Sequence, residues 1–377
     1  MVEIIEKLKI SPMYNLSLSS KELFHSNFLS WLGTCEETKR LFEYVIQELS
    51  EQKDFNLNDK RIEREKHNFD LSIESNGVTE IVIENKVKSF PKLTQLREYE
   101  KKVKEIQKET PCTFILLSLF TTTKEIKPWI TKSYKNLADA LKEKTEEYIT
   151  HSYYKEIIKD YTAFIYNLHK ISELTKLEEG EPYSYTKVSD KESGEKTIYE
   201  ACKEIRFEDF FLKAKYAQIA EKIHEKLSDT VAFKVKQDFD IKKIMAEKSA
   251  IGTIYINHGF TRADGIIEVK IRAKDFVYLI QIQGDSYRRG FENYEKKKKM
   301  PPVLSDEEKN WVNFSDVANT DNEIEVYPSK EGKDYNQYGD NFKYKSFKIS
   351  ATKWNTTQLI AQIMEDIKKC VSFIVNN

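Results

Sequence analysis

Hydrophobic and polar residues alternate most regularly between residues 69 and 87 of the chain. The odd-numbered positions there are nearly all apolar, and the even-numbered positions are nearly all polar. Because side chains alternate between the two faces of a strand, this pattern predicts a half-buried β-hairpin. We expect strands at residues 61–74 and 79–87, joined by a three-residue loop at 75–77 in which Gly77 takes the left-handed conformation.

The register of this hairpin decides which polar side chains meet. Burying both apolar sets together requires even positions to pair with even positions. With a three-residue loop, Asp70 lies opposite Val82, and Glu84 is its diagonal neighbour at roughly 7–8 Å between the backbones. Two carboxylates that reach inward from this separation can share one Mg²⁺ ion, whose oxygen ligands lie at about 2.0–2.1 Å. Lys86 lies on the same face, two residues further along the strand.

Apolar residues at helical spacing flank the hairpin on both sides. The pattern predicts one further strand at residues 112–119, whose continuous apolar run is typical of a buried central strand. A three- to four-stranded mixed sheet with helices on both faces fits these elements. The helices predicted in this half of the chain cover residues 3–8, 20–33, 36–52, 92–109, 134–147 and 151–172.

The helix predicted at residues 92–109 carries a polar stripe beside its apolar side. Gln95, Tyr99 and Lys102 recur there at helical spacing. One interpretation is an ordinary helix surface with Tyr99 half-buried. The other is a wall of a site that orients Lys86 and Glu84 or binds a phosphate group.

The start of the helix predicted at residues 20–33 also has two interpretations. Ser19 and Glu22 have the spacing of a capping box, in which the Glu22 side chain returns to the Ser19 amide. Glu22 also shares a helix face with His25 and Ser26, which leaves a catalytic role equally open. His25 could contact substrate, or it could satisfy a buried partner.

The second half of the chain is predicted to form a separate α+β domain. A charged stretch at residues 174–197 is typical of a linker or an exposed hairpin, and it separates domains at 1–173 and 198–377. Helices are expected at residues 203–227 and 354–375, and strands at 232–239, 251–257, 264–271, 276–283, 323–328 and 342–350.

Two groups of charged residues in this second half invite a functional interpretation. Arg288 and Arg289 could grip phosphate, or they could lie on a surface helix. Asp264, Glu268 and Lys270 form an Asp…Glu-x-Lys pattern, but the two acids lie on one predicted strand and are therefore roughly 13 Å apart. One ion cannot bridge that distance, so we interpret these residues as ordinary strand polarity.

Composition narrows the class of protein. The 377 residues carry a net charge of −1, so any binding of nucleic acid must come from a local basic lining. The four cysteines lie far apart, match no metal or disulfide spacing and suit a reducing cytoplasm. Acidic residues interrupt the N-terminus, which is therefore no signal peptide, and no apolar run approaches the ~20 residues that cross a membrane. We expect a cytoplasmic protein with no membrane partner.

The candidate residues occur in a fixed order along the first half of the chain, as Glu22-Leu23-Phe24-His25-Ser26, Arg64-Glu65, Asp70, Ile83-Glu84-Asn85-Lys86 and Gln95-Leu96-Arg97-Glu98-Tyr99. In this order they resemble the PD-(D/E)xK nuclease superfamily over roughly residues 15–170. The match is closest to bacterial members with an N-terminal Glu-x-x-His-Ser helix and a Gln-Leu-x-x-Tyr motif. Phe69 stands where many members have a proline.

The resemblance implies a restriction-endonuclease-like α/β fold, a mixed sheet flanked by helices, followed here by the second α+β domain. It implies that Asp70, Glu84 and the backbone carbonyl of Asn85 ligate Mg²⁺ or Mn²⁺. Glu22 would complete the metal site directly or through a water molecule.

The resemblance also implies the reaction, hydrolysis of a phosphodiester bond in nucleic acid, DNA more than RNA. Lys86 would orient or deprotonate the attacking water, or stabilise the charge that builds on the phosphate. Gln95 and Tyr99 would hold Lys86 or the backbone in place. The second domain would position substrate or bind a partner.

Other classes of function stay open at this point. The chain could be a catalytically silent binding protein that keeps the fold. It could also be a subunit of a restriction or anti-phage assembly, as a homodimer or with a partner protein that releases its nuclease activity. The sequence contains no P-loop, no Gly-x-Ser-x-Gly motif and no zinc-ligand spacing.

Overall fold

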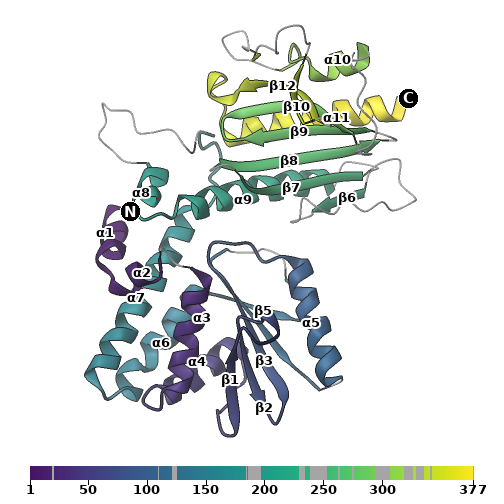
Figure 1. Cartoon of the computed structure of the whole chain (residues 1–377). Coiled ribbons are helices and arrows are strands. Elements are labelled where there is room, and N and C mark those ends of the chain that lie inside the picture. Colours follow the sequence, from purple (N-terminus) through teal and green to yellow (C-terminus); the bar gives the residue numbers. More distant parts are fainter. Residues whose placement is uncertain are drawn as a thin grey trace. The chain divides into compact units, whose positions relative to one another are not determined.

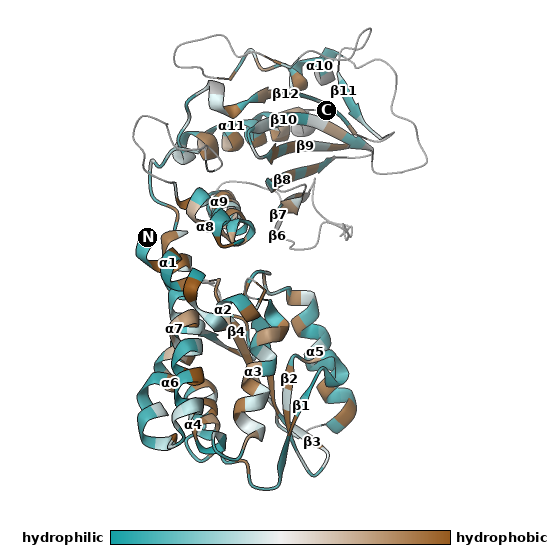
Figure 2. Cartoon of the chain, turned by 60° about the vertical axis from the view of Figure 1, so that its left-hand side comes forward, coloured by the Kyte–Doolittle hydropathy of each residue, from teal (hydrophilic) through white to brown (hydrophobic). Residues whose placement is uncertain are grey.

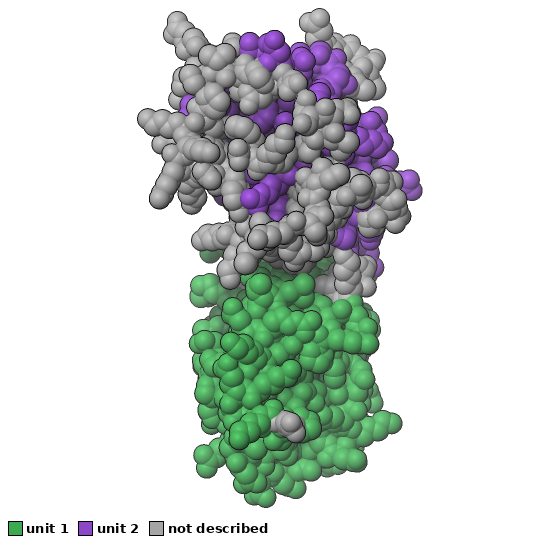
Figure 3. Space-filling model, turned by 90° about the vertical axis from the view of Figure 1, so that its right-hand side faces the viewer, with its two compact units in different colours: residues 1–175, 200–210 green, residues 176–199, 211–377 purple. Residues whose placement is uncertain are grey.

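The fold is that of a computed structural model (Figure 1). It describes residues 1–18, 21–108, 110–120, 125–183, 185, 197–228, 234–237, 253–261, 264–273, 276–293, 306–317, 326–327, 335–339 and 342–376. The chain divides into two compact units, which Figure 3 colours green and purple. Unit 1 consists of Met1–Thr175 and Glu200–Phe210, and unit 2 consists of Lys176–Tyr199 and Phe211–Asn377.

A mixed sheet forms the centre of unit 1. Its described strands number five rather than the expected three or four, and they follow chain order across the sheet. The first three pair antiparallel, whereas the third, fourth and fifth pair in parallel. The strands are β1 (Lys60–Arg64), β2 (Leu71–Ser75), β3 (Val78–Lys86), β4 (Thr113–Ser118) and β5 (Trp129–Ser133).

The strand predicted at residues 61–74 is in fact two strands, β1 and β2. A short 3₁₀ turn, Lys66–Asn68, reverses the chain between them. Glu65, His67 and Asn68 there take left-handed backbone conformations, which interrupt any strand. The alternation of apolar residues continues across this turn, and for that reason it does not reveal the turn.

The hairpin between β2 and β3 also differs from the expectation. Ser75 pairs with Val78, so Asn76 and Gly77 form a two-residue loop, and both have a positive φ, as a type I′ turn requires. A bulge at Glu80 then shifts the register, because Ile73 pairs with Ile81 but Glu74 pairs with Thr79. The bulge restores the even-with-even pairing, and because Leu71 pairs with Ile83 it brings Asp70 level with Glu84 instead of Val82.

Helices cover both faces of the sheet. Helix α5 packs on one face, where its buried Leu96, Tyr99 and Val103 join Val82 and Leu116 in one core cluster. Figure 2 shows hydrophobic and hydrophilic residues alternating around α5, as an amphipathic helix requires. Helices α3, α4 and α6 contact the sheet from the other side. The helices of unit 1 are α1 (Val2–Ile10), α2 (Pro12–Leu16), α3 (Glu22–Thr34), α4 (Lys39–Ser50), α5 (Leu93–Gln107), α6 (Tyr134–Tyr148) and α7 (Ser152–Leu174).

Unit 2 contains a seven-stranded sheet in the order β11-β12-β10-β9-β8-β7-β6. Its strands are β6 (Lys234–Gln237), β7 (Thr253–Thr261), β8 (Asp264–Ala273), β9 (Phe276–Gln283), β10 (Ser286–Asn293), β11 (Asn336–Tyr338) and β12 (Phe342–Lys348). The helices after Thr175 are α8 (Ile198–Glu204), α9 (Glu208–Ser228), α10 (Asp306–Val312) and α11 (Thr356–Asn376), and most of α8 and the first residues of α9 belong to unit 1.

Several expectations for this half change in detail. The helix predicted at 203–227 is interrupted, because Arg206 has a positive φ between α8 and α9. Arg288 and Arg289 lie on strand β10, not on a helix. Most of the strand predicted at 323–328 lies outside the described residues.

The stretch at 174–197 begins with packed residues. Tyr183 is buried, its amide donates to the Trp354 carbonyl, and Glu181 pairs with Lys215 at 2.8 Å. These contacts explain why residues 176–183 belong to unit 2. Across the described ranges, every helix is too short or too polar to cross a membrane.

Candidate active site

Asp70 and Glu84 meet at the end of the β2–β3 hairpin. Asp70 stands just before β2, and Glu84 lies near the end of the buried strand β3. The Asn85 amide donates a hydrogen bond of 2.7 Å to Oδ2 of Asp70. Because the N–H and C=O of one strand residue point to the same neighbour, the Asn85 carbonyl also points to the side of Asp70. The structure therefore gathers two carboxylates and a carbonyl at one strand end.

The two oxygen atoms of Glu84 have different surroundings. Oε1 lies 2.6 Å from Nζ of Lys86 and accepts a 3.0 Å hydrogen bond from Nε2 of Gln95. Oε2 is buried, and no donor in the described part of the chain reaches it. The side chain is only 1% exposed, so water compensates little. A carboxylate oxygen left in this state is the kind of atom that a bound cation would satisfy.

Helix α5 holds both sides of this arrangement through the predicted polar stripe. Gln95 donates to Glu84 and also to the Tyr99 hydroxyl at 2.7 Å. That hydroxyl donates to the Asn68 carbonyl at 2.8 Å, and Lys102 donates to the His67 carbonyl at 2.9 Å. The stripe thus fixes Glu84 and the left-handed turn that precedes Asp70. The three side chains of the stripe therefore bind other parts of unit 1 and do not form a free helix surface.

Glu22 approaches the site from the first turn of α3. Its Oε1 accepts hydrogen bonds from the amides of Val87 and Ser89, at 3.1 and 3.2 Å, and from the Ser89 hydroxyl at 2.6 Å. Glu22 therefore holds the chain directly after Lys86. The alternative interpretation, a capping box with Ser19, involves a residue outside the described part of the chain.

His25 and Ser26, the next polar residues of α3, point into the protein. His25 is fully buried, its Nδ1 lies 3.0 Å from the Tyr161 hydroxyl, and burial lowers the pKa of its imidazole to about 3. It therefore satisfies a buried partner instead of facing substrate. The Ser26 hydroxyl accepts a 2.9 Å hydrogen bond from the Asn85 side chain. Ser26 thereby fixes the residue whose carbonyl adjoins Asp70.

The charges at the site influence one another strongly. Burial raises the pKa of Glu84, and the Asp70 carboxylate raises it further, against the opposing effect of Lys86. Burial also raises the pKa of Asp70, although the Asn85 amide and Lys86 act in the opposite direction. Burial lowers the pKa of Lys86, but Glu84 and Glu22 outweigh it, and the net shift is upward. Each of the two buried carboxylates makes ionisation of the other less favourable. A cation bound between them would stabilise both in the charged form.

The donor set fits a hard divalent cation. Carboxylate and carbonyl oxygens are the ligands that Mg²⁺ and Mn²⁺ prefer, and Mg²⁺ commonly uses only one or two carboxylates and keeps several waters. Asp70, Glu84 and the Asn85 carbonyl provide such a set. Within the described residues, no group of three or more His, Cys, Asp or Glu side chains forms a metal-binding cluster. Glu22 binds backbone amides through Oε1, and its role as a further metal ligand stays a prediction.

Some contacts of the site have no signal in the sequence. The spacing of residues does not identify Ser89, because its partner Glu22 lies 67 positions away in the sequence. The same holds for Tyr134, whose hydroxyl donates to Oδ1 of Asn85 at 3.4 Å. Both lie next to residues that motifs do identify, and only the fold brings them there.

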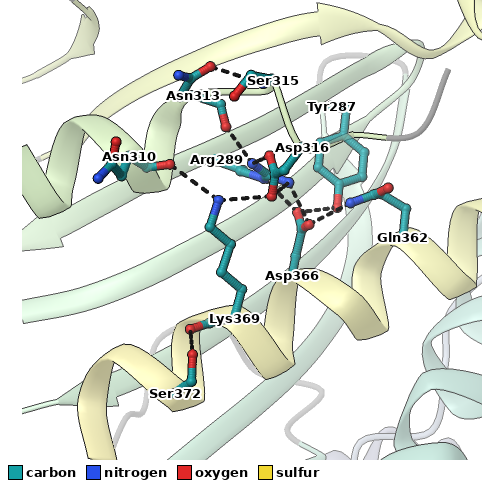
Figure 4. A network of polar contacts seen from close by, with 10 residues as sticks. All are labelled: Tyr287, Arg289, Asn310, Asn313, Ser315, Asp316, Gln362, Asp366, Lys369 and Ser372. Atoms are coloured by element: carbon teal, nitrogen blue, oxygen red, sulfur yellow. Dashed lines mark hydrogen bonds and ion pairs between the residues drawn. The ribbon is translucent and has the colours of Figure 1, made fainter. Parts of the chain in front are cut away.

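Arg288 and Arg289 take other roles than phosphate binding in this structure. Arg289 is fully buried and pairs with Asp366 and Asp316, at 2.7 and 2.8 Å (Figure 4). Arg288 donates to Gln283 at 2.9 Å on the opposite face of β10. Asp264 and Glu268 lie on the single strand β8, as expected, so they do not form a second carboxylate pair.

Comparison with known proteins agrees with this geometry. The family model described as the PD-(D/E)XK nuclease superfamily matches residues 13–185. Searches of curated proteins and of solved structures found no match. The matched residues contain the mixed sheet, both carboxylates, Lys86 and the α5 stripe. Residues 13–185 of this chain are therefore similar to the PD-(D/E)XK nuclease superfamily, and most of this stretch lies in unit 1.

Proposed function

We propose that the chain is a metal-dependent nuclease that hydrolyses phosphodiester bonds, with DNA as its preferred substrate. The observation that supports the proposal is that Oε2 of Glu84, beside Asp70, is buried without a hydrogen-bond donor in the described residues. Lys86 contacts the other oxygen of the same carboxylate. Buried carboxylates in this state are costly unless a cation joins them. The nuclease superfamily match supplies the reaction class.

In this proposal Asp70, Glu84 and the Asn85 carbonyl hold Mg²⁺ or Mn²⁺. When bound, the metal would polarise the phosphate and lower the pKa of a water molecule. Lys86 offers its ammonium to the attacking water or to the charge that develops on the phosphate. Its ion pair with Glu84 keeps it beside the metal ligands.

The remaining site residues position this group. Gln95 orients the Glu84 carboxylate, and Tyr99 ties Gln95 to the turn before Asp70. Glu22 holds the backbone that follows Lys86. Hydrogen bonds to the groups that ligate a metal set the orientation of these groups and the affinity for the metal.

The test is cleavage of supercoiled plasmid, linear duplex and single-stranded DNA in Mg²⁺ or Mn²⁺. Asp70→Ala and Lys86→Ala should each lower the cleavage rate by about 10²–10³-fold, a loss typical of removing a group that stabilises the transition state. Asp54→Ala, which removes an exposed carboxylate of the same unit, is the matched control and should cut like the parent.

Other outcomes identify the alternative classes. If Asp70→Ala and Lys86→Ala cut as well as the parent, the assignment is wrong. If nothing is cut but Mn²⁺ raises the melting temperature of the parent and not of Asp70→Ala, the nuclease depends on a partner or a trigger. If there is neither cleavage nor stabilisation by metal, the domain is a silent scaffold.

A further inference from the structure

The chain directly after Lys86 forms a loop that is held from two directions. This loop, residues 87–92, joins β3 to α5 and is called the β3–α5 loop below. Glu22 of α3 binds its amides, as described above. The second anchor comes from Glu200–Phe210, the returning segment, which belongs to unit 1 although it follows the family match.

Lys88 makes the first contact with the returning segment. Its Nζ lies 3.0 Å from Oδ1 of Asp209 and donates a 2.5 Å hydrogen bond to the Arg206 carbonyl. The same Nζ lies 4.9 Å from the centre of the Phe207 ring. A lysine two residues after the catalytic lysine could serve a substrate phosphate. Here an anion, a carbonyl and an aromatic face of the protein surround its ammonium instead.

Aromatic side chains make the second contact. Phe90 of the β3–α5 loop packs on Phe120, with 3.9 Å between ring centres, and Phe120 packs on Phe210 at 4.7 Å. Phe207 stacks on Phe210 at 4.7 Å. Phe120 and Phe210 are buried. Among the described contacts, an ion pair joins the loop to the returning segment directly, and an aromatic stack joins it to that segment through Phe120.

The turn between α8 and α9 presents these groups to the loop. Arg206 takes a left-handed conformation, and the Phe207 amide donates to the Cys202 carbonyl at 2.8 Å, which closes α8. The chain then enters α9, and Asp209 lies in its first turn. The backbone that carries the Arg206 carbonyl and Asp209 is thus itself fixed by hydrogen bonds.

We propose that Lys88 and Asp209 are positioning residues of the nuclease site, and that the returning segment is a working part of the catalytic unit. The inference rests on the proposed function. Lys86 is followed at once by the amides that bind Glu22, so movement of the β3–α5 loop would move the Lys86 ammonium relative to Asp70 and Glu84. A displacement of about 1 Å can cost a catalytic group about 10²-fold.

The test compares Asp209→Ala, Asp209→Asn and Lys88→Met in the full chain. Each should lower kcat on plasmid DNA about tenfold, the range of a lost supporting contact, with KM within about twofold of the parent. The double variant Lys88→Met with Asp209→Ala should be no slower than Lys88→Met alone, because Asp209 acts on the loop through Lys88. Glu204→Gln is the matched control, since Glu204 lies in the same segment and pairs with Lys9 of α1.

Hydrogen exchange gives a readout that does not depend on cleavage. The amides of Val87 and Ser89 should exchange faster in Asp209→Ala than in the parent or in Glu204→Gln, because the loop loses an anchor. Unchanged exchange at these amides, or a kcat equal to that of Glu204→Gln, would overturn the proposal. If the parent cuts no substrate but exchange rises in Asp209→Ala, the anchor stands and the proposed nuclease function is what failed.

Discussion

Glu84 is the residue on which the contacts of the candidate site converge. Its Oε1 atom contacts Lys86 and Gln95, whereas its Oε2 atom is buried and has no hydrogen-bond donor within the described residues. Gln95 is therefore the donor that decides where the unsatisfied oxygen points. We expect loss of Gln95 to lower the affinity for the metal more clearly than it lowers the stability of the fold.

Gln95→Ala should raise the Mg²⁺ concentration needed for half-maximal cleavage by about 10–100-fold, because the Glu84 carboxylate loses the hydrogen bond that orients it. The measurement is a Mg²⁺ titration of the cleavage rate. Lys104→Ala, an exposed change on the same helix, provides the comparison. Equal titration curves for the two variants would mean that Gln95 does not orient Glu84.

His25 should make unit 1 sensitive to acid. Its folded pKa is lowered from 6.5 to about 3, so below pH 6.5 the unfolded chain takes up a proton that the folded chain refuses. Stability from this residue is complete above pH 6.5 and falls with pH, by about 1.4 kcal/mol per pH unit, until the folded pKa is reached. His25→Phe should lose that part of the slope. Hydrogen exchange of core amides in unit 1, at about pH 6 and about pH 4, measures the difference, and identical slopes would contradict the argument.

Residue types and spacing were informative about the site because its side chains come from two regular elements. Alternation along β3 placed Glu84 and Lys86 on one face of the strand. Helical spacing placed Gln95, Tyr99 and Lys102 on one face of α5. Contacts such as Glu22 with Ser89 depend on tertiary structure alone. The buried state of His25 could be weighed from sequence, but its partner Tyr161 lies 136 residues away.

At the scale of elements, the Asn76-Gly77 turn and the bulge at Glu80 together set the register that aligns Asp70 with Glu84. Gly77 has a φ of +81°, and a Cβ atom there would meet no other atom within 4 Å. Gly77→Ala should therefore cost about 1–3 kcal/mol of unfolding free energy through backbone strain alone. Denaturant titration measures the loss. Ser75→Ala, at a position with ordinary strand backbone, should be nearly neutral, and an equal loss in both variants would exclude backbone strain as the cause.

Helix α11 is attached to the sheet of unit 2 by a buried charge. Arg289 of β10 donates to both oxygens of Asp366, and Tyr287 donates to the same carboxylate (Figure 4). Asp366→Asn should destabilise unit 2 by about 3–5 kcal/mol, because it leaves the Arg289 charge buried with only the half-exposed Asp316. Glu365→Gln, one residue earlier and 66% exposed, should change stability by less than about 1 kcal/mol. Thermal unfolding of both variants decides the matter, and equal melting temperatures would refute the assigned role.

Most helices and strands of unit 1 follow from periodicity, but three features do not. The break between β1 and β2 keeps the apolar alternation, the bulge at Glu80 compensates for a shorter loop, and β5 is short. In unit 2, the hydrophobic pattern does not predict strand β10, because two arginines interrupt it. Arg289 can lie in the core only because Asp366 neutralises it from an element 77 positions away.

At the scale of the whole molecule, the chain does not pass from one unit to the other once. It leaves unit 1 after Thr175, contributes residues 176–199 to unit 2, returns for residues 200–210, and then completes unit 2. The family match ends at residue 185 and therefore omits the returning segment. Composition predicts a boundary at residues 174–197, but it contains no sign of a segment that returns to unit 1.

This exchange has a consequence for cleavage of the protein itself. A recognition sequence for a site-specific protease, inserted at residues 190–193, would divide the chain into two fragments. The first fragment would keep Tyr183, which unit 2 buries against Tyr216, and the second would keep Asp209 and Phe210 of unit 1. Each fragment would thus hold a piece of the other's core. We expect the nicked protein to elute as one peak in native size-exclusion chromatography and to separate only in denaturant, whereas two independent domains on a tether would part as soon as the tether was cut.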